Sequence, residues 1–305
     1  MTTGYLSRDK HQIYWQELGN PEGVPVVIVH GGPGGQTNPK WGNFFNHKKH
    51  RIIFFDQRGC GKSLPFGLTK DNTPEHLVQD MEALRQELGV DKWFIFGGSW
   101  GTTLALLYGL AYPHRCLGFL LRGVWLARST DIEWFLWGAK RFYPKTHTHV
   151  LDTIEMACGY RPQNATEMIF FANQILENSL NIYREEVALA WTGYEYHMSS
   201  LKPTSVDLND PSLLSISLLE SHFLQHELPL KEDLLSQVAR SPIVELPCEI
   251  VHGQYDMVCP VEQAVLLGNI WSCSHSQITL SGHATFETEN EKALYTAAKN
   301  LTTKK

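Results

Sequence analysis

Residues 97–101 read Gly-Gly-Ser-Trp-Gly, which places a serine where a nucleophile would need to stand. The apolar run 93–96 before them predicts a strand, and the Thr-Leu-Ala-Leu-Leu-Tyr stretch after them is typical of a helix. A G-x-S-x-G turn between a strand and a helix strains the serine backbone and exposes its hydroxyl. The segment therefore predicts a nucleophilic Ser99, although a plain glycine-rich turn has the same composition.

A serine hydroxyl is a poor nucleophile near neutral pH, so it needs a general base that a carboxylate orients. On a strand-turn-helix scaffold of this kind the chain order is serine, acid, histidine. Asp256 follows one predicted strand and His283 follows the next, so we expect both to meet Ser99 at the carboxyl edge of a sheet. His275 is the nearest rival, but it precedes the last predicted strand and would lie at the opposite edge.

The loop His30-Gly-Gly-Pro-Gly-Gly35 also follows an apolar segment. Its glycines allow backbone N–H groups to approach a ligand closely. We interpret the loop as one half of an oxyanion hole, with the N–H of Trp100 as the other half. Without a nucleophile nearby, the same residues would form an ordinary turn.

A second loop, Asp56-Gln-Arg-Gly-Cys-Gly-Lys-Ser63, ends like a phosphate-binding loop. A Walker A motif requires glycine at position 56, where this chain has aspartate. A carboxylate at that position would repel phosphate. We therefore expect no ATP or GTP binding.

Apolar runs rich in β-branched and aromatic residues alternate with helical patterns, which predicts a doubly wound, mostly parallel α/β sheet. A helix is expected over residues 73–88, where Thr73 caps the first turn, Pro74 follows it, and leucine and methionine recur on one stripe. The predicted buried strands are residues 24–30, 51–56, 92–97, 117–122, 248–253 and 277–280.

The pattern changes between about residue 125 and residue 240, where no strand is convincing and helices dominate. Asn164-Ala-Thr-Glu167 is typical of a capping box, and residues 213–228 predict another helix. We interpret this region as a cap inserted between two strands. Residues 1–124 and 241–305 would then form the catalytic core, and residues 125–240 the helical cap.

The composition limits the function classes. A chain of 305 residues that is 43% hydrophobic and 19% charged suits one large domain with an insertion. A net charge of −6 without long blocks of like charge argues against a nucleic-acid partner. The N-terminal segment lacks the apolar stretch of a signal peptide, and no apolar run reaches membrane-spanning length. We expect a cytoplasmic protein without a membrane partner.

The six cysteines include no C-x-x-C pair, so we expect neither a disulfide framework nor a zinc knuckle. Reduced and mostly buried thiols are expected instead. His147-Thr-His149 is interpreted as the only close histidine pair, and nearby acids do not complete a site around it. We expect no metal and no cofactor.

Together these segments resemble the prolyl iminopeptidase family of the α/β-hydrolase superfamily over nearly the whole chain. Enzymes of that family release an N-terminal proline from peptides through an acyl-enzyme. The resemblance implies an α/β-hydrolase fold in which Ser99 is the nucleophile, His283 is the base and then the acid, and Asp256 holds the imidazole. Gly32 and Trp100 would supply the oxyanion donors. The matching segments are His30 to Gly35, Asp56 to Gly61, Gly97 to Gly101, Leu121-Arg-Gly123, Asp256-Met-Val-Cys-Pro260 and Ser281-Gly-His283.

An aminopeptidase must also bind a free amino terminus, and carboxylates offset the cost of desolvating its ammonium group. In the family two glutamates of the cap do this. Trp191-Thr-Gly-Tyr-Glu195 is similar to the family's W-x-x-W-E, and Leu219-Glu-Ser-His-Phe223 to its E-N-H-Y-F. The resemblance therefore implies Glu195 and Glu220 as ammonium ligands. Without it, both would be interpreted as ordinary exposed carboxylates.

A proline ring needs a small apolar pocket, which the family builds from aromatic residues at the cap entrance and a cysteine beyond the catalytic acid. Trp125, Phe135, Val258 and Cys259 occupy the matching positions. Trp125 stands where the family usually has phenylalanine, and Phe135 where tyrosine is common. A larger indole would narrow the pocket, and the missing hydroxyl removes a hydrogen bond.

We therefore predict a capped α/β hydrolase that acts as a serine aminopeptidase on small peptides with a free N-terminal proline. One alternative is a serine esterase or amidase with the same triad and no requirement for a free amine. Another is a non-catalytic binding protein on this scaffold, because a fold does not fix a function. The complete set of Ser99, Asp256 and His283 argues against that second alternative.

Overall fold

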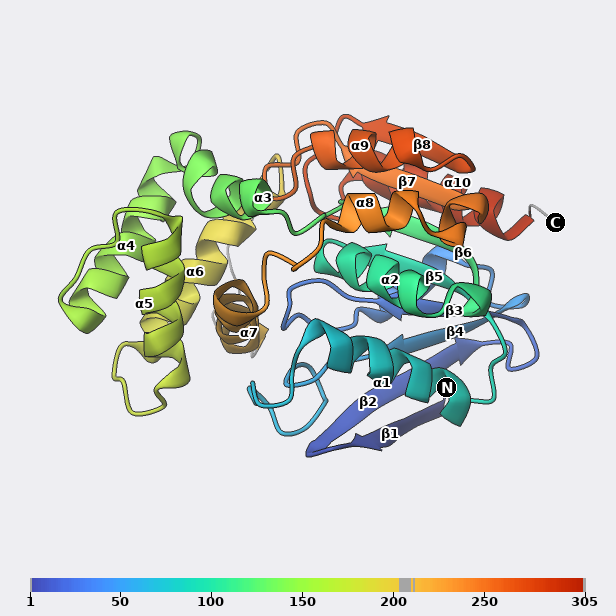
Figure 1. The fold of residues 1–305 in the computed structure, drawn as a ribbon, viewed down its shortest axis with the longest axis horizontal. Helices are drawn as coiled ribbons and strands as arrows, with labels where there is room; N and C mark the ends of the chain where they lie inside the picture. Colours follow the sequence, from blue (N-terminus) through green and yellow to red (C-terminus); the bar gives the residue numbers. More distant parts are fainter. Residues whose placement is uncertain (1, 203–209, 211, 304–305) are drawn as a thin grey trace.

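The computed structural model describes residues 2–202, 210 and 212–303. An eight-stranded sheet in the order β1-β2-β4-β3-β5-β6-β7-β8 forms its centre (Figure 1). β2 pairs antiparallel with β1 and β4, and the other neighbours pair in parallel, so the predicted mostly parallel sheet is confirmed. The strands are β1 Thr2–Arg8, β2 His11–Gly19, β3 Val24–Val29, β4 His50–Phe55, β5 Trp93–Gly98, β6 Cys116–Arg122, β7 Cys248–Gly253 and β8 Ser274–Thr279.

Two strands differ from expectation. The hairpin of β1 and β2 is absent from the predicted elements, because β1 lies at the sheet edge and buries few side chains. β8 begins earlier than predicted, and the prediction that it is buried is wrong because it forms the opposite edge. His275 consequently lies within β8, near its first residue, rather than before it.

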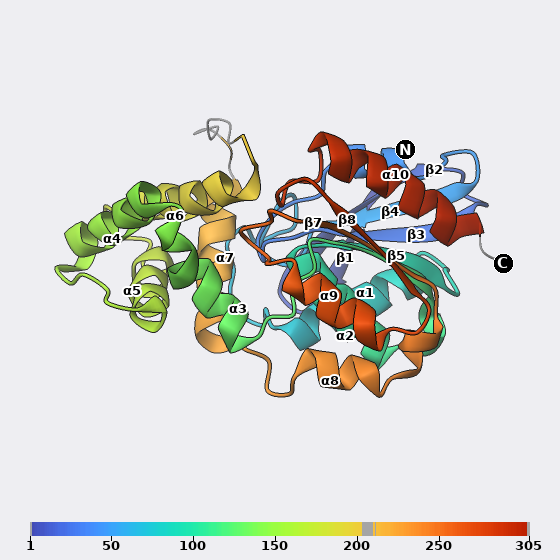
Figure 2. The same ribbon diagram turned by 90° about the horizontal axis from the view of Figure 1, so that it is seen from above.

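Alternate residues of the central strands point to opposite faces of the sheet, as the pleat requires. Val27 and Val29 belong to a core shared with α1 and α2, whereas Val26 and Ile28 belong to a second core shared with α10. Figure 2 shows α10 on one face and α1, α2 and α9 on the other. These helices are α1 Pro74–Glu87, α2 Trp100–Ala111, α9 Glu262–Ile270 and α10 Thr288–Thr303.

The predicted helix over residues 73–88 is confirmed as α1. Thr73 accepts a hydrogen bond from the His76 N–H at 3.3 Å, which satisfies one of the free donors of the first turn. Leu77 and Met81 are buried against the sheet, as their spacing predicts.

Between β6 and β7 the described residues form helices and turns and no strand, as predicted. α4 to α7 pack on one another at one end of the molecule, whereas α8 contacts α2 and α9 beside the sheet (Figure 1). The elements are α3 Ser129–Glu133, η3 Trp134–Gly138, η4 Ala139–Arg141, α4 Pro144–Cys158, α5 Ala165–Glu177, α6 Arg184–Ser199, α7 Ser212–His226, α8 Leu234–Ala239 and η5 Pro242–Glu245. The remaining short helices are η1 Pro39–Phe44 and η2 Pro113–Arg115.

The capping box predicted at the start of α5 forms only in part. Asn164 accepts from the Glu167 N–H at 2.9 Å, but the Glu167 carboxylate accepts from the Gln163 N–H instead of that of Asn164. The helix start itself is as expected.

All six cysteines carry free thiols, of which Cys158 and Cys273 are exposed and the others are buried. His147 is buried and bonds through Nε2 to the Leu136 carbonyl at 2.9 Å, which is a structural role. Within the described ranges, no helix combines the length and the apolarity that crossing a membrane requires.

Candidate active site

Ser99 lies at the turn from β5 to α2 with φ 57° and ψ −127°, a backbone conformation that L residues rarely adopt. A Cβ atom at Gly97 would lie 2.3 Å from the Gly101 carbonyl oxygen, and one at Gly101 would lie 2.2 Å from that of Val29. Both glycines are thus required by the close approach of α2 to the sheet. The predicted strained serine is confirmed, but the residue is only 9% exposed because it faces a cavity instead of open solvent.

Asp256 and His283 form the contact that the chain order predicts. Asp256 Oδ2 accepts from His283 Nδ1 at 2.7 Å, and Oδ1 accepts from the N–H groups of Val258 and Cys259 at 3.0 and 2.7 Å. Burial opposes ionisation of Asp256, but His283, His252 and the Cys259 N–H together hold the pKa of that carboxyl below its ordinary value. The carboxylate therefore fixes the ring and leaves Nε2 as the nitrogen free to take a proton.

Arg122, at the end of β6, connects the serine turn to the histidine loop. Its carbonyl oxygen accepts the Ser99 N–H at 2.9 Å, and its Nη1 donates to the His283 carbonyl at 2.6 Å. A Cβ atom at Gly123 would lie 2.9 Å from His283 Cε1, so the imidazole packs on bare backbone. The sequence assigns Arg122 no role, because a contact spanning 161 residues leaves no trace in local spacing.

Gln57 ties the glycine loop after β3 to the serine turn. Its backbone N–H donates to His30 Nε2 at 2.9 Å, and its side-chain amide donates to the His30 carbonyl at 2.8 Å. The indole N–H of Trp100 donates to Gln57 Oε1 at 2.9 Å. The two loops that carry Gly32 and Trp100 are therefore held in one hydrogen-bonded unit.

Asp56 closes the loop that superficially resembles a phosphate-binding loop. Its carboxylate accepts from the Thr37 N–H and hydroxyl at 2.9 and 2.8 Å and from the Lys62 N–H at 2.8 Å. The Ser63 hydroxyl donates to the Asp56 carbonyl at 2.6 Å. Two donors that a phosphate would use, the Lys62 N–H and the Ser63 hydroxyl, are thus occupied inside the loop.

The end of α6 is fastened to the histidine loop. Glu287 accepts from the N–H groups of Leu201 and Gly282 at 2.7 and 2.5 Å. The Ala284 N–H also donates to the Ser199 carbonyl at 2.7 Å. The helix that carries Glu195 is therefore positioned directly against the loop that carries His283.

Ser99 faces a small cavity. Pro33 and Leu224 also line it and are missing from the predicted set. Leu224 follows Glu220 by one helical turn, so its place on the same face of α7 is readable from spacing. The predicted residues that this cavity brings together are Gly32, Ser99, Trp125, Phe135, Glu195, Glu220, Val258 and Cys259.

One wall of the cavity is apolar. Trp125, Phe135, Val258 and Cys259 are each at most 7% exposed. Burial raises the pKa of the Cys259 thiol well above its ordinary value, so it stays protonated and behaves as a small apolar group.

The lining of the cavity also includes two carboxylates. Burial raises the pKa of Glu195, on α6, to about 7. Burial and the charge of Glu195 together raise the pKa of Glu220, on α7, even though Trp191 Nε1 donates to it at 2.8 Å. In the part of the chain that the structure describes, no basic side chain forms an ion pair with either carboxylate. The cavity thus has an unmet preference for a cation.

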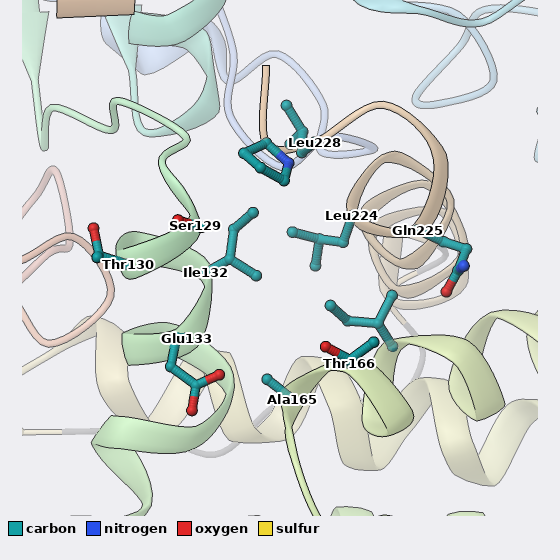
Figure 3. A pocket seen from close by; sticks show the side chains of 11 residues that line it. Ser129, Thr130, Ile132, Glu133, Ala165, Thr166, Leu224, Gln225 and Leu228 are labelled. Atoms are coloured by element: carbon teal, nitrogen blue, oxygen red, sulfur yellow. The ribbon is translucent and has the colours of Figure 1, made fainter. Parts of the chain in front are cut away.

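A larger and more open cavity adjoins the first, and Leu224 borders both. Figure 3 shows Ile132 and Leu224 pointing into it, with Glu133 and Gln225 at its rim. Its lining includes no buried titratable side chain and no predicted catalytic residue, so the smaller cavity is the candidate for catalysis.

Replacing Glu220 with glutamine should change the pH dependence of stability. A carboxyl whose folded pKa is raised binds more protons when folded than when unfolded, so its contribution to stability falls as pH rises above about 4.5. Glu220→Gln removes that loss and should raise the thermal unfolding midpoint at pH 8 more than at pH 5. The exposed control Glu245→Gln should shift neither value. Equal shifts at both pH values for Glu220→Gln would contradict the raised pKa.

Comparison with known proteins places this geometry in a family. Residues 24–290 match the family model described as the alpha/beta hydrolase fold. The chain is 35% identical over 308 residues to the proline iminopeptidase of Neisseria gonorrhoeae. The match covers 98% of this chain and 96% of that protein. It is 37% identical over 297 residues to the proline iminopeptidase of Xanthomonas citri, with 95% and 92% covered.

Solved structures agree on the fold. An esterase from Exiguobacterium antarcticum superposes with a TM-score of 0.69 at 19% identity, covering 99% of this chain and 100% of that one. A proline iminopeptidase from Mycobacterium smegmatis gives a TM-score of 0.62 at 14% identity, covering 99% and 98%. The esterase and the peptidase share the scaffold, so the structural likeness speaks for the fold alone. On the sequence matches and the family model, the chain belongs to the α/β-hydrolase family and, within it, to the proline iminopeptidases.

Proposed function

We propose that the protein is a serine aminopeptidase that releases N-terminal proline from small peptides. The observation that carries the proposal is that Glu195 and Glu220 lie in the same cavity as Ser99 and lack a basic partner. A hydrolase for uncharged esters has no use for two carboxylates in the cavity of its nucleophile, because their mutual repulsion costs free energy. The relatives named proline iminopeptidase support the same activity.

In this proposal the substrate's ammonium group binds between Glu195 and Glu220, which become ionised as it enters. Charge-assisted hydrogen bonds then replace the water that the ammonium loses. The proline ring packs on the apolar wall formed by Trp125, Phe135, Val258 and Cys259. Binding at both ends of the residue places its carbonyl carbon beside the Ser99 hydroxyl.

Ser99 Oγ attacks that carbonyl while His283 Nε2 takes the hydroxyl proton. Asp256 keeps Nδ1–H directed away from the serine and stabilises the imidazolium. The N–H groups of Gly32 and Trp100 stabilise the oxyanion, and loss of one such donor costs about 2.7 to 4 kcal/mol in a characterised protease. His283 then protonates the leaving amine, and water hydrolyses the acyl-enzyme by the same route.

We also propose that residues 125–240 act as a cap on a catalytic core made of residues 1–124 and 241–305. The cap supplies Glu195, Glu220 and part of the apolar wall, and the core supplies the triad. Its last helix, α8, rests on the core, which would anchor the return of the chain to β7.

A panel of anilides tests the activity. Prolyl anilide should be cleaved, and N-acetyl-prolyl anilide should not, because acetylation removes the charge that the carboxylates bind. Alanyl anilide measures the contribution of the proline wall, and Ser99→Ala should abolish all cleavage. Ester cleavage without dependence on a free amine would favour a general esterase. Failure of an active-site phosphonate to label Ser99 would favour a binding protein.

Glutamine at either carboxylate should separate amine recognition from chemistry. Glu195→Gln and Glu220→Gln should each lower kcat/KM for prolyl anilide by at least about 30-fold, since losing one partner of a buried charge pair costs about 2 kcal/mol or more. Cleavage of a phenyl ester, which has no ammonium, should be largely spared. Glu245→Gln is the matched surface control and should change neither rate. Equal losses on both substrates would assign the two glutamates a purely structural role.

A further inference from the structure

Three metal-ligating side chains converge on the surface of α5 and α7, outside both cavities. His222 and His226 are four residues apart on α7, and their ring centroids lie 4.9 Å apart. Glu177, the last residue of α5, accepts a hydrogen bond from His222 Nδ1 at 3.0 Å. One ligand atom from each of these residues lies within 4.8 Å of the other two.

We propose that Glu177, His222 and His226 form a binding site for a divalent transition-metal ion, with Zn²⁺ as the ion they fit. Two imidazole nitrogens and one carboxylate oxygen are ligands that zinc takes, and water would fill a fourth position. In a tetrahedral site with bonds of 2.0–2.1 Å, neighbouring ligand atoms lie about 3.3 Å apart. Glu177 and His226 are exposed, so packing leaves both side chains room to rotate toward that spacing.

The packing favours this site. α5 and α7 are already in contact, and Asn173 donates to the Ser221 hydroxyl at 3.4 Å beside the site. A bound ion would link α5 to the helix that carries Glu220.

This proposal differs from the expectation that the chain binds no metal. His147 and His149 are two residues apart on α4, and residues with that spacing point to different sides of a helix. Under this proposal the relevant histidine pair is His222 and His226, which have i, i+4 spacing on α7. Glu177 lies on α5, and no local sequence pattern links it to that pair.

Calorimetric titration with Zn²⁺ tests the site independently of the proposed activity. The titrated protein carries three substitutions, Cys158→Ser, Cys273→Ser and His283→Ala. The first two remove the exposed thiols, and the third disrupts the other possible metal-binding group, Asp256, Cys259 and His283. One equivalent of zinc should bind and raise the thermal unfolding midpoint.

In that background, His226→Ala and Glu177→Gln should each weaken zinc binding by about 10-fold or more. At known metal sites, loss of a residue that only hydrogen-bonds to a ligand already costs about 10- to 100-fold in affinity. His114→Ala removes an exposed histidine on the core and should leave binding unchanged. Absence of saturable binding, or equal affinity in the His226→Ala protein, would overturn the proposal.

Discussion

Two carboxylates share one cavity with Ser99, and their mutual repulsion is the constraint on which the proposed site depends. Glu195 and Glu220 come from different helices, and each ionises less readily because it is buried. Trp191 donates to Glu220, and the Tyr194 hydroxyl donates to the Phe135 carbonyl at 3.1 Å, so α6 is fixed to both sides of the cavity. An entering ammonium would remove the repulsion and supply the missing charge. In the proposed function, selectivity for an amine would follow from electrostatics, whereas the apolar wall would contribute shape.

The core provides the matching rigidity. Ser99 occupies a strained conformation, and such strain persists only where surrounding contacts hold it. Arg122 bonds to the serine turn and the histidine loop, and Gln57 bonds the glycine loop to Trp100. Glu287 extends this network to the end of α6. Hydrogen bonds thus join the end of α6 and the serine turn to the same loop, the one that carries His283.

The parts of this arrangement that depend on local pattern were predictable from the sequence. The positions of Asp256 and His283 after two neighbouring strands predicted their contact, because parallel strands end at one edge. The β1–β2 hairpin was not predictable by the same reasoning, since an edge strand needs little apolar patterning. β8 shows the reverse error, because its Ile278 is 42% exposed despite an apolar local run.

Local sequence patterns alone did not predict the contacts between distant segments. The link from Arg122 to the His283 carbonyl and the raised pKa values of the two glutamates arise only when separate elements pack together. The resemblance to a family identified Glu195 and Glu220 as a pair, but it did not show that burial keeps them from ionising.

Proton release on binding a small cyclic amine tests the amine-binding role most directly. L-Prolinol carries the ring and the ammonium of proline but no carbonyl to hydrolyse. Calorimetry at pH 7 in buffers of different ionisation enthalpy gives the number of protons exchanged. If the ammonium binds between Glu195 and Glu220, it lowers their pKa values, so binding releases protons and the release disappears in the double glutamine variant. Binding without proton release, or the same release in that variant, would contradict this placement of the amino terminus.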